Sequence, residues 1–368
     1  MRGERTGVRP GTVRARAYTI PTDKPEADGT MHWDSTTLVV VEIDGGGRTG
    51  LGYTYTDGCI ARLVTHKLAG VIRSHDVMDP PSAWQAMRAA VRNMGAEGLA
   101  ANAIAAIDAA LWDLKAKLLD LPLAVLLGRC RDAVRIYGSG GFTTYSDADL
   151  TEQFRGWIER DGCAWVKMKV GTHPAQDPHR VAVGRKAAGE RGLFVDGNGA
   201  YDAAHALAQA EIFARDSGVA WFEEPVSSDD LDSLRLLRGR MPAGMEVAAG
   251  EYAYRPEYVR RMLEARAVDV QQVDVTRCLG ITGFLRAAAL CEAHGIDLSA
   301  HCAPALHLHP CCAAPRLRHL EWFHDHVRIE HMLFDGAPLP REGVIRPDLS
   351  RPGLGLELRR QDAERYQI

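Results

Sequence analysis

Four short stretches decide the fold: Val166-Lys167-Met168-Lys169, Val195-Asp196, Phe222-Glu223 and Gly250-Glu251. Each of the three acids follows an apolar run, and the steps between them are 27 and 28 residues. A step of that length holds one strand, one helix and two loops, which is the rhythm of a parallel β/α barrel. The strands of such a barrel all end at one mouth, so we expect the three carboxylates to meet there.

Carboxylates that meet at one mouth repel one another unless a cation joins them. An all-oxygen set of ligands suits a hard ion such as Mg²⁺. One acid at the end of a strand is usually a helix cap, but three in consecutive units favour a metal site. The sequence therefore predicts Asp196, Glu223 and Glu251 as ligands of Mg²⁺.

Lys167 and Lys169 are two residues apart, so on a strand both side chains point to the same face. If that face is the barrel interior, desolvation or a nearby cation would lower the pKa of these lysines, and a neutral lysine is a usable general base. The alternative is a surface strand with two solvated lysines and with Val166 and Met168 in the core. The pair alone leaves both interpretations open.

Two further strand ends carry polar groups that suit catalysis. Asp274 ends the sixth expected strand and His301 ends the seventh, 27 residues later. A carboxylate beside an imidazole raises its pKa and fixes its tautomer, so we expect this pair to work as an acid or a base. Glu321 lies on the eighth strand and closes the ring of polar residues.

Short apolar runs alternate with amphipathic stretches from about residue 134 onward, which predicts parallel strands joined by right-handed crossovers. The last interval, between His301 and His319, contains three prolines, so we expect no full helix there. Eight barrel strands are expected, at residues 134–138, 164–170, 193–196, 220–223, 246–250, 268–274, 297–301 and 319–322.

The first third of the chain has a different texture. Residues 13–20, 36–44 and 49–55 are rich in β-branched residues, and a glycine turn at 45–47 predicts a hairpin between the last two. An apolar stripe from Ile104 to Leu118 predicts a helix that Pro122 follows. We expect an α+β capping domain over residues 1–130, completed by the tail 332–368, and a catalytic barrel over 131–331.

Composition sets outer limits on function. The chain has 368 residues, of which 46% are hydrophobic and 25% charged, with a net charge of −4. No basic stripe favours nucleic acid or an anionic membrane. The charged start at residues 1–5 is unlike a secretory signal, and the 8 cysteines form no C-x-x-C pair, so we expect reduced thiols and a cytoplasmic location.

These motifs together resemble the enolase superfamily and, within it, the mandelate racemase subgroup (mandelate racemase/muconate lactonizing enzyme-like). The resemblance covers most of the chain and includes the helix that contains Ile107-Asp108-Ala109-Ala110-Leu111-Trp112-Asp113. It implies an α/β fold, a modified TIM barrel of the (β/α)₇β type with an α+β N-terminal cap. It also implies a homo-oligomer that acts on a small carboxylate.

The resemblance further implies roles for single residues. Lys169 would be a base on one side of the substrate's α-carbon, and His301, oriented by Asp274, would act on the other side. Lys167 would lie beside the substrate carboxylate and help lower the pKa of Lys169. Glu321 would hydrogen-bond a carboxylate oxygen of the substrate, and Glu224 would lie behind the metal ligands. A lysine or histidine base with Mg²⁺ and an ene-diolate is the known pattern of the superfamily, not a deduction from these residues.

The reaction stays open between two outcomes of the same deprotonation. A polar mouth with Asn198, His301, Glu321 and Arg277 favours an acid-sugar dehydratase, which converts an aldonate or aldarate to a 2-keto-3-deoxy acid. A racemase or epimerase of a 2-hydroxy acid is the alternative. Trp33, with nearby aromatic residues of the cap, could close over a less polar substrate, although ordinary packing also explains those residues.

Two other functions need different chemistry. The stretch from His301 to Cys312 contains His307, His309 and Cys311 and could hold Zn²⁺, but its spacing matches no zinc module. A lysine Schiff-base aldolase on the same barrel would not need three carboxylates at the mouth.

Overall fold

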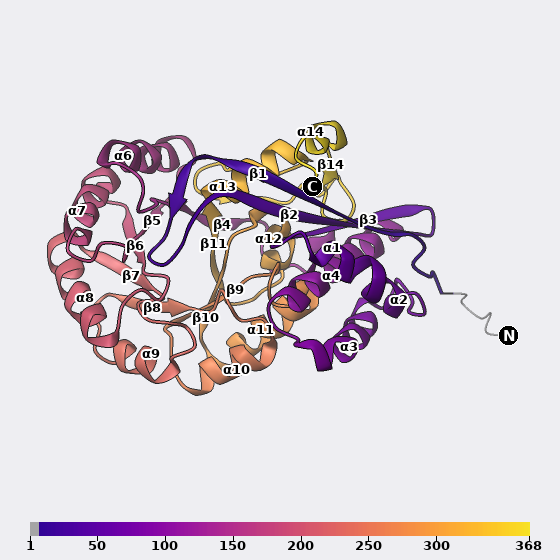
Figure 1. The fold of residues 1–368 in the computed structure, drawn as a ribbon, viewed down its shortest axis with the longest axis horizontal. Coiled ribbons are helices and arrows are strands. Elements are labelled where there is room, and N and C mark those ends of the chain that lie inside the picture. Colours follow the sequence, from indigo (N-terminus) through magenta and orange to yellow (C-terminus); the bar gives the residue numbers. More distant parts are fainter. Residues whose placement is uncertain (1–6) are drawn as a thin grey trace.

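The computed structural model describes residues 7–368, so the charged residues 1–5 lie outside the described part. Figure 1 shows a ring of helices around a barrel, a long hairpin that crosses the barrel mouth, and a group of helices beside it. The C-terminus lies close to the hairpin, over elements that come from the start of the chain (Figure 1). Among the described helices, none is both long and apolar enough to traverse a bilayer.

The barrel is a closed ring of eight parallel strands, in which β11 pairs with β4. All eight strands that the sequence predicted are recovered to within two residues at each end. The strands are β4 (Val134–Gly140), β5 (Trp165–Lys169), β6 (Gly192–Asp196), β7 (Val219–Glu223), β8 (Glu246–Ala249), β9 (Val270–Val273), β10 (Asp297–Ala300) and β11 (Leu317–Phe323). The predicted modified TIM barrel with an N-terminal cap is confirmed.

A helix follows each strand of the barrel, and these helices cover the outside of the ring (Figure 1). Apolar residues of the strands that point outward, such as Val166, Met168 and Val195, are buried against them. These helices are α6 (Asp147–Arg155, continued by η3, Gly156–Arg160), α7 (Asp177–Ala188), α8 (Ala203–Ser217), α9 (Leu231–Arg238), α10 (Pro256–Glu264), α11 (Gly280–His294), α12 (Pro304–Cys312) and α13 (His324–Leu333).

The expectation that no full helix fits between the last two strands is wrong. Helix α12 (Pro304–Cys312) occupies this interval. Pro304 stands in its first turn, where N–H groups have no acceptor within the helix, so the missing N–H of proline removes no hydrogen bond. Pro310 lies near the end, and the helix stops two residues later.

The cap is a three-stranded antiparallel sheet of β1 (Val13–Ala27), β2 (His32–Gly45) and β3 (Arg48–Tyr55) with helices on one face. Gly50 and Gly52 lie on the same side of β3, where an added Cβ would collide with the backbone of the long helix. Glycine therefore allows helix and strand to approach closely. The helices are α1 (Ile60–Leu63), η1 (Val64–Leu68), α2 (Ala69–Ile72), α3 (Pro80–Val91), η2 (Arg92–Met94), α4 (Leu99–Leu118) and α5 (Leu123–Leu126).

One buried acid on α4 (Leu99–Leu118) joins the cap to the barrel. Asp108 accepts hydrogen bonds from the backbone N–H of Thr282, at 2.8 Å, and from its hydroxyl, at 2.7 Å. Both donors belong to the first turn of α11 (Gly280–His294), whose N–H groups have no partner within the helix. Trp112 donates to the same hydroxyl at 2.9 Å. Helices α4 and α11 are therefore joined by contacts between residues that lie 170 or more positions apart in the sequence.

The C-terminal tail binds both parts of the molecule. Strand β13 (Val344–Ile345) pairs antiparallel with β4, and strand β14 (Glu357–Leu358) pairs antiparallel with β12 (Phe334–Asp335). Farther on, the tail follows the cap: Thr19 N–H donates to the carbonyl of Tyr366, beyond α14 (Arg360–Glu364). Buried Asp113 of α4 accepts from the N–H of Leu51 and of Leu354, which holds cap strand, helix and tail together.

Inside the barrel, an aromatic layer lies beneath the mouth. Tyr137, Phe194 and Trp221 are buried there around His319, with ring centroids 4.7, 5.8 and 5.3 Å from the imidazole. Burial lowers the pKa of His319 to about 3, so this imidazole is neutral. Because side chains on a strand alternate, the next inward positions toward the mouth carry the polar residues of the site.

Candidate active site

Three carboxylates meet at the barrel mouth, as the spacing predicted. Lys169 pairs with Asp196 and Asp196 with Glu223 in the registers of β5–β6 and β6–β7, so the side chains lie side by side. Glu251 follows β8. One oxygen from each of Asp196, Glu223 and Glu251 lies within 4.8 Å of the others, and all three residues are buried. An all-oxygen cluster of this size suits a hard divalent cation.

Both lysines point into the barrel, which excludes the surface-strand interpretation. Lys169 Nζ donates to Asp196 Oδ2 at 2.6 Å. Lys167 lies deeper and is fully buried, with its ammonium bonded to Glu223 and 2.8 Å from Glu321 Oε1. Each lysine of β5 therefore contacts a predicted metal ligand on a nearby strand, and Lys167 also contacts Glu321 on β11.

In the protein alone, the pKa values of both lysines are raised, not lowered as the sequence analysis expected. Desolvation pulls the pKa of Lys169 down, but the attraction of Asp196 outweighs it. Glu223 and Glu321 act in the same way on Lys167. The sequence argument weighed desolvation and neighbouring cations, and it omitted the anions that accompany them.

The mouth has an excess of negative charge. Desolvation raises the pKa of Glu223 and of Glu224, and neighbouring acids raise both further. Oε1 of Glu224 is buried without a hydrogen-bond partner among the described residues, and Oε2 of Glu251, which lies 3.3 Å from His301 Nε2, accepts no well-formed hydrogen bond there. Carboxylate oxygens in this condition are unsatisfied, and a divalent cation would relieve both the repulsion and the missing contacts. The residues present therefore fit a divalent ion.

The expected imidazole–carboxylate pair is formed. His301 Nδ1 lies 2.9 Å from Asp274 Oδ2, which leaves Nε2 facing Glu251 Oε2 at 3.3 Å. Burial acts to lower the pKa of His301, but Cys302, Glu251 and Glu321 raise it well above the usual value. The pKa of Asp274 falls to about 2, because hydrogen bonding to His301 outweighs its burial. The neighbouring anions therefore favour the protonated form of His301, and Asp274 fixes the orientation of its ring.

Lys169 and His301 stand far apart around the mouth. Their strands, β5 and β10, are separated by three steps in the closed ring, through β4 and β11. Both side chains line the same pocket. A substrate in that pocket would therefore have one of these groups on either side.

Glu321 lies behind this pocket and does not line it. Its Oε1 accepts from Ser139 Oγ at 2.5 Å and from Lys167, and its Oε2 accepts from the backbone N–H of Cys302 at 3.0 Å. The pKa of Glu321 is lowered because Lys167 and His301 outweigh its burial. Its predicted contact with a substrate carboxylate stays a prediction.

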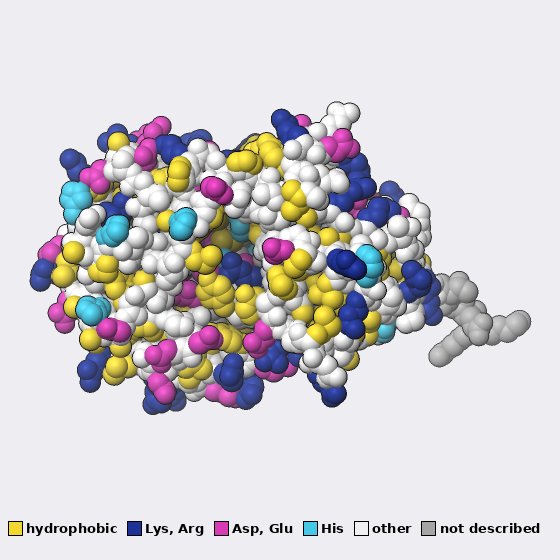
Figure 2. Space-filling model, in the orientation of Figure 1, with side chains coloured by type: hydrophobic (Ala, Val, Ile, Leu, Met, Phe, Trp, Pro, Cys, Tyr) yellow, Lys and Arg dark blue, Asp and Glu magenta, His cyan; other side chains and the backbone are white. Residues whose placement is uncertain are grey.

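The pocket has a volume of about 410 Å³ and opens between the cap hairpin and the barrel mouth. Figure 2 shows this face hollowed near its centre, with basic side chains visible inside the hollow. Hydroxyls and acids from the cap form much of the wall, namely Asp28, Ser35, Thr36, Thr37, Thr56 and Asp57. The wall is therefore suited to a polar substrate.

Barrel loops hold the tip of the hairpin in place over the mouth. Thr143 N–H donates to the carbonyl of Ala27 at 2.9 Å, and Thr172 Oγ1 donates to the carbonyl of Asp28 at 2.5 Å. A Cβ on Gly29 would collide with backbone oxygens of Val170 and Gly197, so only glycine allows this approach.

The three residues predicted to contact substrate all line the pocket: Asn198, Arg277 and Trp33. Arg277 already donates to Glu251 Oε1 at 2.9 Å, and Trp33 Nε1 donates to Glu26 Oε2 at 2.8 Å. Tyr55 also lines the pocket, whereas Tyr53 is buried and donates to Glu330. Packing explains Tyr53, whereas Trp33 and Tyr55 line the pocket.

Sequence reasoning missed Cys302, His326 and Tyr252, which also line the pocket. His326 stacks on Tyr55 with ring centroids 3.5 Å apart, and its Nδ1 accepts from the N–H of Ala303. Cys302 directly follows His301, and this position next to a predicted site residue could have identified it as a pocket residue. No spacing pattern points to the other two.

The remaining histidines of the suspected zinc stretch serve the backbone. His307 Nε2 accepts from the N–H of Val275 at 2.8 Å, and His309 Nδ1 accepts from the N–H of Ala124 at 3.0 Å. Burial lowers the pKa of His309 to about 4. Within residues 7–368, neither histidine belongs to a group of three or more metal-ligating side chains.

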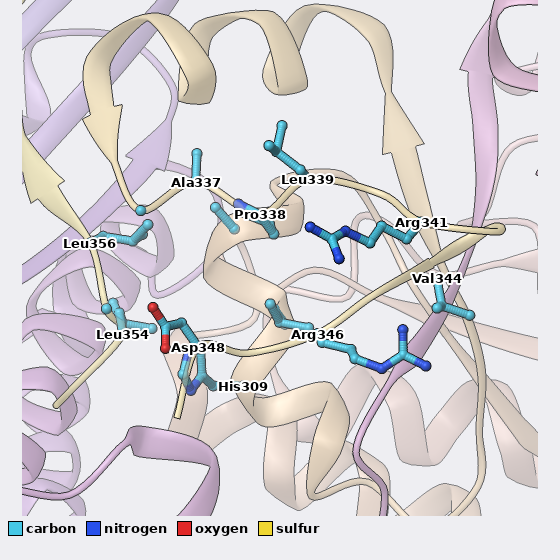
Figure 3. Close-up of a pocket in the computed structure, with 14 residues that line it drawn as sticks. His309, Ala337, Pro338, Leu339, Arg341, Val344, Arg346, Asp348, Leu354 and Leu356 are labelled. Carbon is cyan, nitrogen blue, oxygen red and sulfur yellow. The ribbon is translucent and has the colours of Figure 1, made fainter. Parts of the chain in front are cut away.

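A second cavity, of about 580 Å³, lies between α12 and the C-terminal tail. Figure 3 shows Arg341 and Arg346 on the tail before and after β13, with Pro338 and Leu339 on the stretch that precedes Arg341, while His309 and Asp348 lie at the other side. None of the predicted catalytic residues lines it. It is larger than the pocket at the mouth, but the acidic cluster is elsewhere.

The fold and the site together define an enzyme of the enolase superfamily. The mandelate racemase/muconate lactonizing enzyme N-terminal domain matches residues 13–128, and the enolase C-terminal domain-like family matches residues 149–363. The chain belongs to the mandelate racemase/muconate lactonizing enzyme family.

Several characterised relatives act on acid sugars. A 3,6-anhydro-alpha-L-galactonate cycloisomerase of Streptomyces coelicolor is 31% identical, over 94% of this chain and 96% of its own length. A D-galactarolactone cycloisomerase of Agrobacterium fabrum is 28% identical, over 97% and 98%. An L-talarate/galactarate dehydratase of Salmonella typhimurium is 30% identical, over 81% and 77%.

Solved structures share the whole architecture. A mandelate racemase/muconate lactonizing enzyme-like protein from Rubrobacter xylanophilus is 52% identical with a TM-score of 0.95, covering 98% of this chain and all of that one. A racemase from Streptomyces coelicolor with bound magnesium is 29% identical with a TM-score of 0.91, covering 98% of this chain and all of that one.

Proposed function

We propose that this enzyme removes the proton α to the carboxylate of an acid sugar and expels the β-hydroxyl as water, which gives a 2-keto-3-deoxy acid. The observation that carries the proposal is the mouth itself. Three buried carboxylates lie within 4.8 Å of one another, and Lys169 and the His301–Asp274 pair stand on distant strands around them. Asp196, Glu223 and Glu251 would hold Mg²⁺, as magnesium is bound in the Streptomyces coelicolor racemase.

The first step creates a second negative charge next to the substrate carboxylate. A bound magnesium ion would supply positive charge where that negative charge develops. Lys167, fully buried and charged, contributes a fixed cation beside it. Lys169 takes the α-proton in this proposal, and that role requires a neutral amine. Occupation of Asp196 by a cation is therefore part of the proposal, because Asp196 holds the proton on Lys169.

The second step needs an acid. His301 is protonated and its Nδ1–H is fixed by Asp274, so Nε2 can give its proton to the leaving β-hydroxyl. The C–O bond breaks, water leaves, and the enol that remains tautomerises to the 2-keto acid. Asn198, Arg277 and Trp33 would position the substrate, and Glu321, which lies behind the pocket wall, would contact its carboxylate.

The polar wall supports an acid sugar as substrate. The hydroxyls of Ser35, Thr36, Thr37 and Thr56 can pair with several hydroxyls of a sugar chain. A volume of about 410 Å³ lies within the range of about 300–1,000 Å³ that small-molecule sites have. In this proposal, residues 1–130 and 332–368 form the cap that selects the substrate, and residues 131–331 form the catalytic barrel.

A cycloisomerase is the second candidate, because two relatives that span almost the whole chain are cycloisomerases of acid-sugar lactones or anhydro sugars. Deprotonation at the α-carbon would be the same. The leaving oxygen would then belong to a ring of the substrate, so it would stay within the product.

Mass spectrometry separates these reactions. The purified enzyme with Mg²⁺ would be incubated with a panel of aldonates, aldarates and their lactones. A product lighter by one water supports the dehydratase, and a rearranged product of equal mass supports the cycloisomerase. Inversion with uptake of solvent deuterium and no keto product would show a racemase or epimerase instead. No change in any acid sugar would overturn the proposal.

A further inference from the structure

We propose that His301, Cys302 and Glu321 form a second metal site, which binds a thiophilic divalent cation such as Zn²⁺ or Co²⁺ beside the acidic cluster. One ligand atom of each residue lies within 4.8 Å of the other two, and all three residues are buried. The set offers nitrogen, sulfur and oxygen, whereas the acidic cluster offers oxygen only. Softer ions prefer the first set and Mg²⁺ prefers the second.

The distances between these atoms match a zinc coordination sphere. Cys302 Sγ lies 3.3 Å from His301 Nε2 and 3.3 Å from Glu321 Oε2, and the nitrogen lies 3.6 Å from that oxygen. Bonds of about 2.3 Å to sulfur and about 2.0–2.2 Å to nitrogen and oxygen, at tetrahedral angles, would separate the same atoms by about 3.4–3.6 Å. The three donors therefore need to move very little to share one ion.

The supporting contacts of a metal site are also in place. His301 is held through its other ring nitrogen by Asp274 at 2.9 Å, an arrangement that orients metal-binding histidines. Oε1 of Glu321 is held by Ser139 and Lys167, which leaves Oε2 toward the cysteine. His301 and Cys302 line the pocket at the mouth, so an ion and a water ligand can enter from there.

The backbone fixes Cys302 in this position. Its N–H donates to Glu321 Oε2 at 3.0 Å, and its φ of 54° is in the left-handed region that side chains rarely adopt. On binding, the thiol releases its proton to solvent and the thiolate forms the bond to the metal. Because the same ion takes Nε2 of His301, it removes the acid of the proposed reaction. This consequence, inhibition, rests on the proposed function, whereas the binding itself does not.

Cobalt absorption tests the site without any substrate. Co²⁺ would be titrated into the full-length protein already saturated with Mg²⁺. We expect one Co²⁺ per chain, with the near-ultraviolet band of a cobalt–thiolate bond and the intense visible bands of a four-coordinate ion. Cys302→Ser should abolish the thiolate band and weaken Co²⁺ binding. The loss of affinity should exceed the roughly 10–100-fold loss that follows mutation of a residue that only hydrogen-bonds to a metal ligand. Cys59→Ser and Cys130→Ser, which alter the two exposed thiols, should leave both unchanged.

A thiolate band that survives in Cys302→Ser, or that disappears in either surface variant, would overturn the proposal. Cys302→Ala serves as a second variant if the serine form does not fold. The effect of Zn²⁺ on turnover would then be measured with a substrate of the enzyme. We expect Zn²⁺ to inhibit the wild type, a chelator to reverse the inhibition, and Cys302→Ser to resist it. Lack of turnover would count against the proposed function alone, because the cobalt spectrum does not depend on it.

Discussion

At the scale of single residues, the site is a balance between buried cations and buried acids. Lys169 is paired with Asp196, and His301 is paired with Asp274 while its other nitrogen faces Glu251. Each group is charged because of its neighbour, and its burial alone would favour the neutral form. In the proposed reaction, proton transfer would therefore depend on which partner each group has when the proton moves.

Replacing the two groups separately distinguishes their roles. We expect Lys169→Ala to abolish both product formation and exchange of the α-proton with solvent deuterium. His301→Asn should lower product formation by about 10²–10⁴-fold, the usual contribution of a general acid, and keep exchange. Both would be followed by NMR in deuterated buffer on the substrate found in the panel. Exchange that is lost in His301→Asn and kept in Lys169→Ala would reverse the two roles.

At the scale of elements, the joint between α4 and α11 fixes the cap to the barrel. Asp108 satisfies the first-turn N–H and hydroxyl of Thr282, and Gly280 leaves the carboxylate room to do so. Burial raises the pKa of Asp108 to about 7, although the contacts with Thr282 act against the rise. The cap carries half of the pocket wall, so this joint also sets the height of the hairpin over the mouth.

Removing this joint should destabilise the protein strongly. We expect Asp108→Ala to lower the free energy of unfolding by about 2–3 kcal/mol. The buried N–H and hydroxyl of Thr282 would lose their acceptor, and the hydroxyl that accepts from Trp112 would no longer be held in place. Asp202→Ala removes an exposed cap from α8 and should cost only about 1 kcal/mol. Urea unfolding followed by circular dichroism compares the two, and equal losses would show that the joint contributes no more than an ordinary cap.

At the scale of the whole molecule, two regions hold acids without matching cations. One is the barrel mouth. The other lies where the hairpin meets the barrel, where Glu26 is fully buried with Oε1 unpaired among the described residues. Desolvation first, and then Asp325, raises the pKa of Glu26 to about 9. Both regions lie at contacts between cap and barrel, so charge there acts on closure as well as on chemistry.

Divalent ions should stabilise the folded protein through the first region. We expect Mg²⁺ at about 100 times its Kd to add about 2.7 kcal/mol of stability, and a chelator to remove it. Glu223→Gln should lose most of this gain, because one ligand oxygen becomes an amide group. Thermal melts with and without Mg²⁺ measure the effect. A gain of equal size in the variant would place the ion elsewhere.

The second region predicts a pH dependence of stability. Folded Glu26 keeps its proton between its ordinary pKa of 4.5 and about 9, whereas the unfolded chain loses it near 4.5. The folded state thus binds more protons in this window, so its contribution to stability falls as pH rises. We expect Glu26→Gln to reduce that fall in a series of thermal melts across the window. Asp34→Asn, which alters an exposed acid of the same hairpin, should keep the slope of the wild type.

Much of the site was visible in the sequence because strand ends of a barrel converge whatever the loops do. The three acids, the lysine pair and the Asp274–His301 pair needed only their spacing. The protonation of the lysines was not visible, since it depends on how many acids surround each amine. The helix between the last two barrel strands was missed because three prolines suggested a break. Pro304 stands in the first turn of α12 and Pro310 near its end, where they do little harm, and Pro315 lies beyond the helix.

The sequence alone determined the barrel, its cap and the set of charged side chains that meet at its mouth, because a repeat of strand and helix leaves one arrangement for the residues at the strand ends. Only the tertiary structure decided which hairpin residues line the pocket, that Cys302 lies beside His301 and Glu321, and that Asp108 holds two distant helices together. These contacts link segments far apart in the chain, and their formation depends on distances that packing sets and no local pattern encodes.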